Sequence, residues 1–246
     1  MMFFNYTAYY NKQLILLIYI LSCFATRVHA QTEFAYITDP DGYVNVREGE
    51  GLKYRVVGRI SVGELFWAAS KTPNSEWIYV NCMAPISSVK TDEYDLILDG
   101  RVLMSGYIHN SRLSRLAAPF KSVDMIFIPK ESRYEGLTDS ILISFELAPY
   151  HRSDSVPHNE TWGVDFNAGQ PKIMLKGAHL QWGEQSFELN TRGFYEPNIE
   201  TLQAFYDRTS QTHIITMYNG DGAGYYICAW QLFKNGTTKR YGFRPY

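Results

Sequence analysis

The fold of this chain is constrained most by one pattern: short apolar and aromatic runs alternate with turn-forming residue pairs. Long stretches with helical periodicity are nearly absent. Asp41-Gly42, Asp99-Gly100 and Asn235-Gly236 each lie between runs rich in Val, Ile, Tyr, Phe and Trp. Such pairs tolerate the positive φ angles of tight turns, and runs of this composition are typical of strands. The pattern predicts an all-β chain, with hairpins around Asp99-Gly100 and Asn235-Gly236.

Composition narrows the classes of protein that fit. Of the 246 residues, 46% are hydrophobic and 20% are charged, which excludes a disordered chain. The formal net charge of −2 argues against a general nucleic-acid binder, because phosphate contacts need a basic excess. Aromatic residues reach 15%. Rings at this level suit strands, but they also suit ring-lined binding faces, and the sequence must be searched for both.

Residues 1–30 are expected to be a signal peptide. Lys12 precedes the apolar run 14–25, which is too short to span a bilayer comfortably, and Val28-His29-Ala30 places small residues at the positions that a signal peptidase reads. We therefore expect an exported protein, periplasmic or extracellular, with no transmembrane span after cleavage. A lipid anchor on Cys23 is the less favoured alternative, because the residues before it match a lipoprotein site poorly.

Two cysteines, Cys82 and Cys228, follow the expected cleavage site. An oxidising compartment permits a disulfide between them, but spacing does not decide the matter, and we favour two buried small hydrophobic residues. Neither a CxxC pair nor a paired-histidine spacing is present, so no metal site is expected. No cofactor is expected either.

The mature chain is expected to divide near residues 114–120. Residues 111–118 are expected to form a short helical piece that ends before Pro119. The predicted parts are residues 34–113 and residues 118–246. Within the second part, residues 149–157 are expected to form an exposed loop between strands over 141–147 and 161–166.

The first part carries a series of motifs in register. It opens with Gly-Tyr-Val-Asn-Val-Arg-Glu-Gly at residues 42–49, followed after a short spacer by Val-Val-Gly-Arg-Ile at 56–60. Further motifs follow in order: Gly63-Glu64 leading to Phe66-Trp67, Trp77-Ile78-Tyr79-Val80, Gly106-Tyr107-Ile108-His109 and Ser111-Arg112-Leu113. Over residues 34–113 this series closely resembles the bacterial SH3 (SH3b) domain family. The connection over residues 83–103 is longer than is usual in that family, which suggests an inserted hairpin at Asp99-Gly100.

The resemblance implies a small barrel that binds extended peptides or glycan-peptide polymers, often of the bacterial cell wall, and it implies no catalysis. In such a barrel Val44 and Val46 would point inward and Asn45 outward. Flat amphipathic rings bind such ligands at low entropy cost. The candidate ligand-binding residues are Tyr43, Arg47, Trp67, Trp77, Tyr79 and Tyr107.

Each candidate has a structural alternative. Trp77 and Tyr107 lie on central strands, where rings often fill the interior. Arg47 can brace the loop that follows it or meet a ligand carboxylate, and the bracing role is favoured.

The second part is expected to be β-rich and sandwich-like, and it shows no motif of a known reaction. Segments 195–200 and 221–230 are similar to uncharacterised secreted bacterial proteins that also carry SH3b domains, a similarity that gives no activity. The chemical possibilities are weak: a metal site at His151, Asp154 and His158, calcium binding at the glycine-rich 219–224, for which a hairpin turn is the better interpretation, or acid–base pairs among Glu184, Glu188, Glu196 and Glu200.

These observations favour an exported, non-enzymatic binding protein whose SH3b-like module recognises cell-envelope peptide or peptidoglycan. Two alternatives stay open. One is a cell-wall hydrolase with its catalytic site in residues 118–246, an expectation that comes only from analogy. The other is an envelope interaction or inhibitor protein whose second part caps a protein partner. No nucleic-acid partner is expected.

Overall fold

The fold was analysed in a computed structural model, which describes residues 33–69, 75–89, 96–116, 121–138, 140–165, 167, 169–208, 210–220 and 222–245. Glu33–Tyr246 form one compact unit. The predicted signal peptide and Cys23 lie outside the described residues. Where the chain is described, none of its helices has the length and apolar character needed to cross a bilayer.

The predicted all-β class is confirmed. The described residues form antiparallel sheets, and their helical elements are single turns of 3-10 helix. These turns are η1 (Ile86–Ser88), η2 (Asn110–Arg112), η3 (Pro129–Glu131), η4 (Arg152–Asp154), η5 (His158–Glu160), η6 (Ile199–Thr201) and η7 (Gly222–Gly224).

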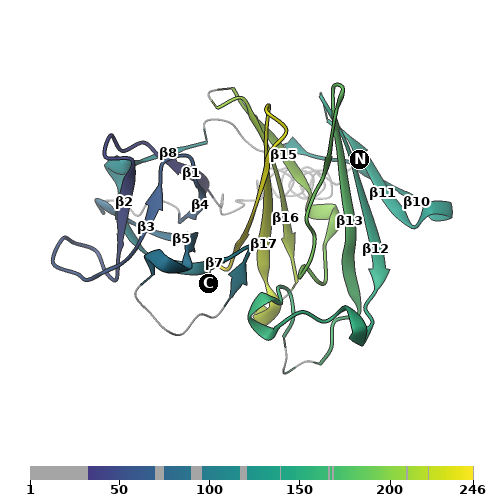
Figure 1. Cartoon of the computed structure of the whole chain (residues 1–246), viewed down its shortest axis with the longest axis horizontal. Coiled ribbons are helices and arrows are strands. Elements are labelled where there is room, and N and C mark those ends of the chain that lie inside the picture. Colours follow the sequence, from purple (N-terminus) through teal and green to yellow (C-terminus); the bar gives the residue numbers. More distant parts are fainter. Residues whose placement is uncertain are drawn as a thin grey trace, which may run out of the picture. The chain divides into compact units, whose positions relative to one another are not determined.

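The first sheet is curled and barrel-like (Figure 1). Its strand order is β3-β2-β7-β5-β4-β1-β8, and β6 pairs with β7 at the side. Val44 and Val46 point into its core, as the alternation along β2 predicts. The strands are β1 (Glu33–Ile37), β2 (Tyr43–Arg47), β3 (Val56–Ser61), β4 (Leu65–Ala68), β5 (Trp77–Pro85), β6 (Ile97–Leu98), β7 (Arg101–His109) and β8 (Leu113–Arg115).

Two five-stranded sheets make up the rest of the described fold and face each other as a sandwich (Figure 1). One has the order β10-β11-β12-β13-β14 and the other β18-β17-β16-β15-β9. Their facing side chains meet in the core, where the rings of Phe145 and Trp230 lie 5.9 Å apart. The strands are β9 (Lys121–Ser122), β10 (Met125–Ile128), β11 (Arg133–Leu137), β12 (Ile141–Pro149), β13 (Ile173–Trp182), β14 (Gln185–Glu188), β15 (Gln203–Asp207), β16 (Thr212–Asn219), β17 (Tyr226–Phe233) and β18 (Thr238–Phe243).

The β16–β17–β18 sheet is covered on both faces. On β17, Trp230 points into the sandwich, while its neighbour Gln231 points the other way and donates a hydrogen bond to the Tyr36 hydroxyl of β1 at 3.1 Å. Seven of the eight residues of β17 are buried, which explains why this strand is a nearly continuous apolar run. Phe34 and Trp67 of the curled sheet therefore belong to the same core cluster as the sandwich.

The hairpin predictions are confirmed. Asp99 and Gly100, with φ angles of 50° and 70°, form a two-residue turn between the paired residues Leu98 and Arg101. Asn235-Gly236 lies in the turn between β17 and β18, where Gly236 has a φ of 88°.

Two local predictions are wrong. Within the segment 111–118, which was predicted to be a short helical piece, the described residues form the end of η2 and then β8, which pairs with β1. Where the structure describes the strand predicted over 161–166, at residues 161–165, the chain is a loop with a single bridge from Trp162 to Phe194. In both places the pairing partner lies far along the chain, so local composition carries little signal.

Cys82 and Cys228 are both free and both buried, as favoured from the sequence. Burial raises the pKa of each thiol well above its ordinary value, because the interior disfavours the thiolate. Each cysteine is thus a small core residue and a poor nucleophile.

One histidine is buried between the sheets of the sandwich. His213 on β16 is 3% exposed, and its ring centroid lies 4.4 Å from that of Trp182 and 4.5 Å from that of Tyr206. Burial lowers its pKa from 6.5 to about 4, because an imidazolium would lose its hydration there.

This histidine predicts an acid-sensitive fold. Between about pH 6.5 and pH 4 the His213 imidazole is protonated in the unfolded chain and neutral in the folded chain. The free energy of unfolding therefore falls as the pH falls. The contribution amounts to about 2 to 3 kcal/mol between pH 7.5 and pH 4.5. Urea unfolding at both pH values should show that His213→Leu loses about this much less than the unmodified protein. An equal loss in both proteins would contradict the prediction.

Candidate functional site

A groove of about 610 Å³ opens on the curled sheet and contains three of the six predicted ligand-binding residues: Tyr43, Arg47 and Trp77. It lies where β2, the start of β5, the end of β7 and η2 come together. The lining residues are Asp39, Asp41, Tyr43, Val44, Asn45, Arg47, Leu52, Glu76, Trp77, His109, Ser111 and Arg112.

Tyr43 presents its ring on one wall of the groove. It is the first residue of β2 and alternates with the buried Val44, so its side chain points away from the core and is 38% exposed. The guanidinium of Arg59 lies 4.5 Å from the ring centroid, and its Nε donates to the Asn45 amide oxygen at 3.2 Å. These contacts hold the ring in place while one face remains accessible.

Arg47 braces the loop between β2 and β3. Its Nη1 donates to the backbone carbonyls of Leu52 at 3.0 Å and Tyr54 at 2.8 Å. The Tyr54 ring in turn lies against Gly49, where an added Cβ would come within 2.7 Å of the ring, so only glycine fits. The bracing role favoured from the sequence is therefore present, and Arg47 shapes the groove through this loop.

Trp77 and His109, a cross-strand pair of β5 and β7, also line the groove. Their rings meet edge to face with centroids 5.5 Å apart. His109 Nδ1 accepts the backbone N–H of Ser111 at 3.3 Å and lies 2.7 Å from its hydroxyl oxygen. The neutral imidazole therefore carries its proton on Nε2, which lies 3.8 Å from a carboxylate oxygen of Glu76.

The floor of the groove carries a fixed charge pair. Asp39 is 7% exposed, its carboxylate is paired with Arg112, and it also accepts the backbone N–H of Asp41 at 2.9 Å. Together with Arg47, Asp41 and Glu76, this pair gives the groove charges of both signs. A ligand with both amino and carboxylate groups fits such a lining better than a uniformly charged one.

The other three predicted residues lie elsewhere. Tyr79 and Tyr107 form the next cross-strand pair of β5 and β7, with ring centroids 5.6 Å apart, and the Tyr79 ring lies 6.4 Å from that of Trp67. Trp67 is 5% exposed and packs in the core shared with the sandwich. Trp77 and Tyr107 are not members of the barrel core cluster, so among these rings it is Trp67 that is buried.

Glu76 and His109 were not predicted from the sequence as groove residues. His109 occurred only as the end of a closing strand motif, and Glu76 carries no motif at all. The available signal was the alternation on β7: Tyr107 and His109 point to the same face, so a ring at one position places the other beside it.

The structure gives little support to the metal site and the acid–base pairs considered for the second part. The Asp154 carboxylate accepts the His151 backbone N–H at 2.9 Å and so caps a 3-10 turn. Of the four glutamates, Glu196 lines a groove of about 440 Å³ together with Asp165 and accepts the backbone N–H of Ile173 at 3.4 Å. No group of three metal-ligating side chains occurs in the part of the chain that the structure describes.

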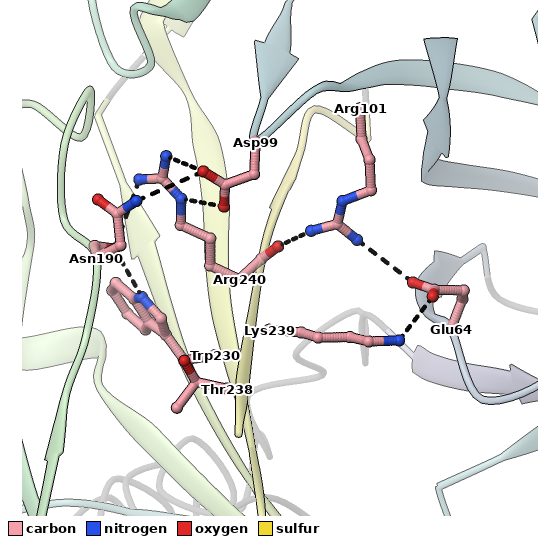
Figure 2. A pocket seen from close by; sticks show the side chains of 8 residues that line it. All are labelled: Glu64, Asp99, Arg101, Asn190, Trp230, Thr238, Lys239 and Arg240. Atoms are coloured by element: carbon pink, nitrogen blue, oxygen red, sulfur yellow. Dashed lines mark hydrogen bonds and ion pairs between the residues drawn. The ribbon is translucent and has the colours of Figure 1, made fainter. Parts of the chain in front are cut away.

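A smaller pocket of about 260 Å³ lies between the Asp99 hairpin and β18 (Figure 2). Arg240 Nε and Nη2 donate to the two Asp99 carboxylate oxygens at 2.6 and 2.7 Å, and Arg240 Nη1 donates to the Arg192 carbonyl at 2.7 Å. Glu64 pairs with Arg101 at 3.3 Å and with Lys239 at 2.8 Å. Each of these charged side chains has a partner of the opposite sign, and the pairs form a joint between the curled sheet and β18.

Comparison with known proteins adds no relative: no protein-family model, no curated protein and no solved structure matches the chain. Its function must therefore be argued from the groove and the surfaces described above.

We expect Asp99 and Arg240, the ion pair in the joint, to be strongly coupled in their effects on the free energy of unfolding. The Arg240 side chain is 8% exposed, so Asp99→Asn, which keeps the positive φ that Asn tolerates, leaves a buried charge without its counter-ion. We expect a loss of about 3 kcal/mol of unfolding free energy. In a double-mutant cycle with Arg240→Gln, the coupling energy should exceed about 1 kcal/mol.

The surface pair Arg133–Glu135, 2.6 Å long with both side chains partly exposed, provides the control for that cycle. Arg133→Gln should cost no more than about 1 kcal/mol. Additive effects of the Asp99 and Arg240 substitutions in urea unfolding would contradict the coupling.

Proposed function

We propose that this chain is an exported, non-enzymatic binding protein that recognises a peptide of the cell envelope, or the peptide part of peptidoglycan, through the groove at Tyr43 and Trp77. The observation that carries the proposal is the groove itself. Two rings, those of Tyr43 and Trp77, line it together with charged groups of both signs.

The chemistry of such ligands suits this lining. Stem peptides of the cell wall carry free amino and carboxylate groups on short, extended chains, and rings with mixed charges offer each of these a partner. The resemblance of residues 34–113 to SH3b domains and the signal-like residues 1–30 support the same class of ligand and an exported location.

The second part supports binding over hydrolysis. A hydrolase needs an open cleft with carboxylates beside the substrate. The groove that contains Asp165 and Glu196 is lined by no aromatic ring, and Glu196 there accepts a backbone N–H of Ile173. The large rings of the sandwich fill its interior: Trp162, Phe194, Tyr226 and Trp230 are each at most 1% exposed. They stabilise the fold and leave the groove of the curled sheet as the better site.

Co-sedimentation with purified peptidoglycan tests the proposal on the chain from Gln31 onward, which contains the whole compact unit. We expect the protein to pellet at micromolar concentration, and Tyr43→Ala and Trp77→Ala each to weaken binding about five- to tenfold through loss of ring contact. Tyr206→Ala is the matched control, because Tyr206 is 40% exposed, close to the 38% of Tyr43, but lies on β15.

Protein that stays in the supernatant at every concentration would refute the proposal, as would equal losses from all three substitutions. The same incubation distinguishes the enzymatic alternative. Binding alone releases no fragments, whereas new soluble fragments that disappear with Glu196→Gln would establish a hydrolase.

A further inference from the structure

The charged side chains that line the groove of the curled sheet are unequally paired. Three carboxylates, those of Asp39, Asp41 and Glu76, lie there with two guanidiniums, those of Arg47 and Arg112. A ligand gains affinity and specificity where it supplies the opposite charge to a group that has no partner in the free protein. The pairing of each group therefore indicates which charge of a ligand the groove selects.

Both guanidiniums already meet acceptors within the protein. Arg47 Nη1 donates to two backbone carbonyls, that of Leu52 at 3.0 Å and that of Tyr54 at 2.8 Å. Arg112 is paired with the carboxylate of Asp39, whose side chain is only 4% exposed. These contacts fix the loop after β2 and the floor of the groove, so both cations have a role before any ligand arrives.

Two carboxylates of the groove lack a basic partner. Asp41 uses its backbone N–H on Asp39, and where the chain is described its own exposed carboxylate has neither an ion pair nor a hydrogen bond. The Glu76 side chain is 82% exposed, and a carboxylate oxygen lies 3.8 Å from Nε2 of His109, which is too far for a hydrogen bond. Neither carboxylate thus has a lysine or arginine partner among the described residues.

Each of these carboxylates is carried beside a ring of the same groove. Asp41 lies two residues before Tyr43, and Glu76 directly precedes Trp77. An aromatic face attracts a cation, as the guanidinium of Arg59 shows at 4.5 Å from the Tyr43 ring centroid. A carboxylate next to a ring suits an alkylammonium group, because the carboxylate meets the charge and the ring meets its methylene stem.

We propose that Asp41 and Glu76 bind the side-chain ammonium group of a diamino acid in the peptide. The inference rests on the proposed function and names the group by which the groove selects its peptide. In peptidoglycan the first residue of the stem peptide is joined to the glycan through its α-nitrogen, so a diamino acid carries the free amine on its side chain. An ammonium group donates three hydrogen bonds and can meet carboxylates from two directions. Asp41 and Glu76 are thus specificity-determining residues.

N-acetylation of purified peptidoglycan tests the proposal, because it removes the ammonium charge and leaves the carboxylates and the glycan in place. The chain from Gln31 onward should co-sediment with the acetylated polymer about tenfold more weakly than with the unmodified polymer. Conversion of the polymer's carboxylates to methylamides should weaken binding no more than about threefold. A greater loss from this conversion than from acetylation would overturn the proposal.

Substitutions in the protein test the two carboxylates directly. Asp41→Asn and Glu76→Gln should each weaken binding to the unmodified polymer about fivefold, and should change binding to the acetylated polymer by less than about twofold. Glu48→Gln is the matched control, because Glu48 is an exposed glutamate that pairs with Arg55 at 3.4 Å and does not line the groove. It should leave binding to both polymers unchanged, and circular dichroism should show that each variant is folded.

The outcomes separate this inference from the proposed function. Equal binding to the unmodified and acetylated polymers would overturn the ammonium assignment and leave the proposed function intact. Losses from Asp41→Asn and Glu76→Gln that persist on the acetylated polymer would also overturn it, since the carboxylates would then act on something other than the amine. Failure to bind either polymer would refute the proposed function and the inference with it.

Discussion

The rest of the structure depends on burial of the β16–β17–β18 sheet on both of its faces. One face of β17 sends Trp230 against Phe145 of the sandwich, and the other sends Gln231 toward Tyr36 of the curled sheet. Tyr241 of β18 completes this contact by donating its hydroxyl hydrogen to the Gln231 amide oxygen at 3.0 Å. Buried polar groups are stable only when they are paired, and here each partner comes from a different part of the chain. The two parts are therefore joined by one core.

This shared core explains which aromatic side chains are buried and which line the groove. Rings that suit strands and rings that suit a binding face are alike in sequence, and burial separates them. Trp67 packs in the shared core, whereas Tyr43 and Trp77 flank a groove. The joint at Asp99 and Arg240 adds a charged contact beside the apolar one, and it gives the extra hairpin of the curled sheet a structural reason: its turn carries the carboxylate that Arg240 needs.

Much of the fold was predictable because it is local. Turn pairs at Asp99-Gly100 and Asn235-Gly236 identified hairpins, and alternation along β2 identified Val44 and Val46 as core residues. Half of the candidate ligand residues lie in the groove, because strand alternation also places their side chains outside the core. What the sequence did not predict is long-range pairing: β8 with β1, or Trp67 against the sandwich. Such contacts depend on tertiary packing, and neither a turn pair nor a periodicity reports them.

Strand β7 has a consequence for how the groove and the joint act together. Its first residue, Arg101, belongs to the joint, and its last residue, His109, belongs to the groove. The nine residues between and including them form continuous strand, about 27 Å from end to end, paired along its whole length with β5. A force applied beside His109 would thus be carried along hydrogen-bonded backbone to Arg101, whose guanidinium donates to the Arg240 carbonyl of β18. Mechanically, the groove is anchored to the whole of the compact unit.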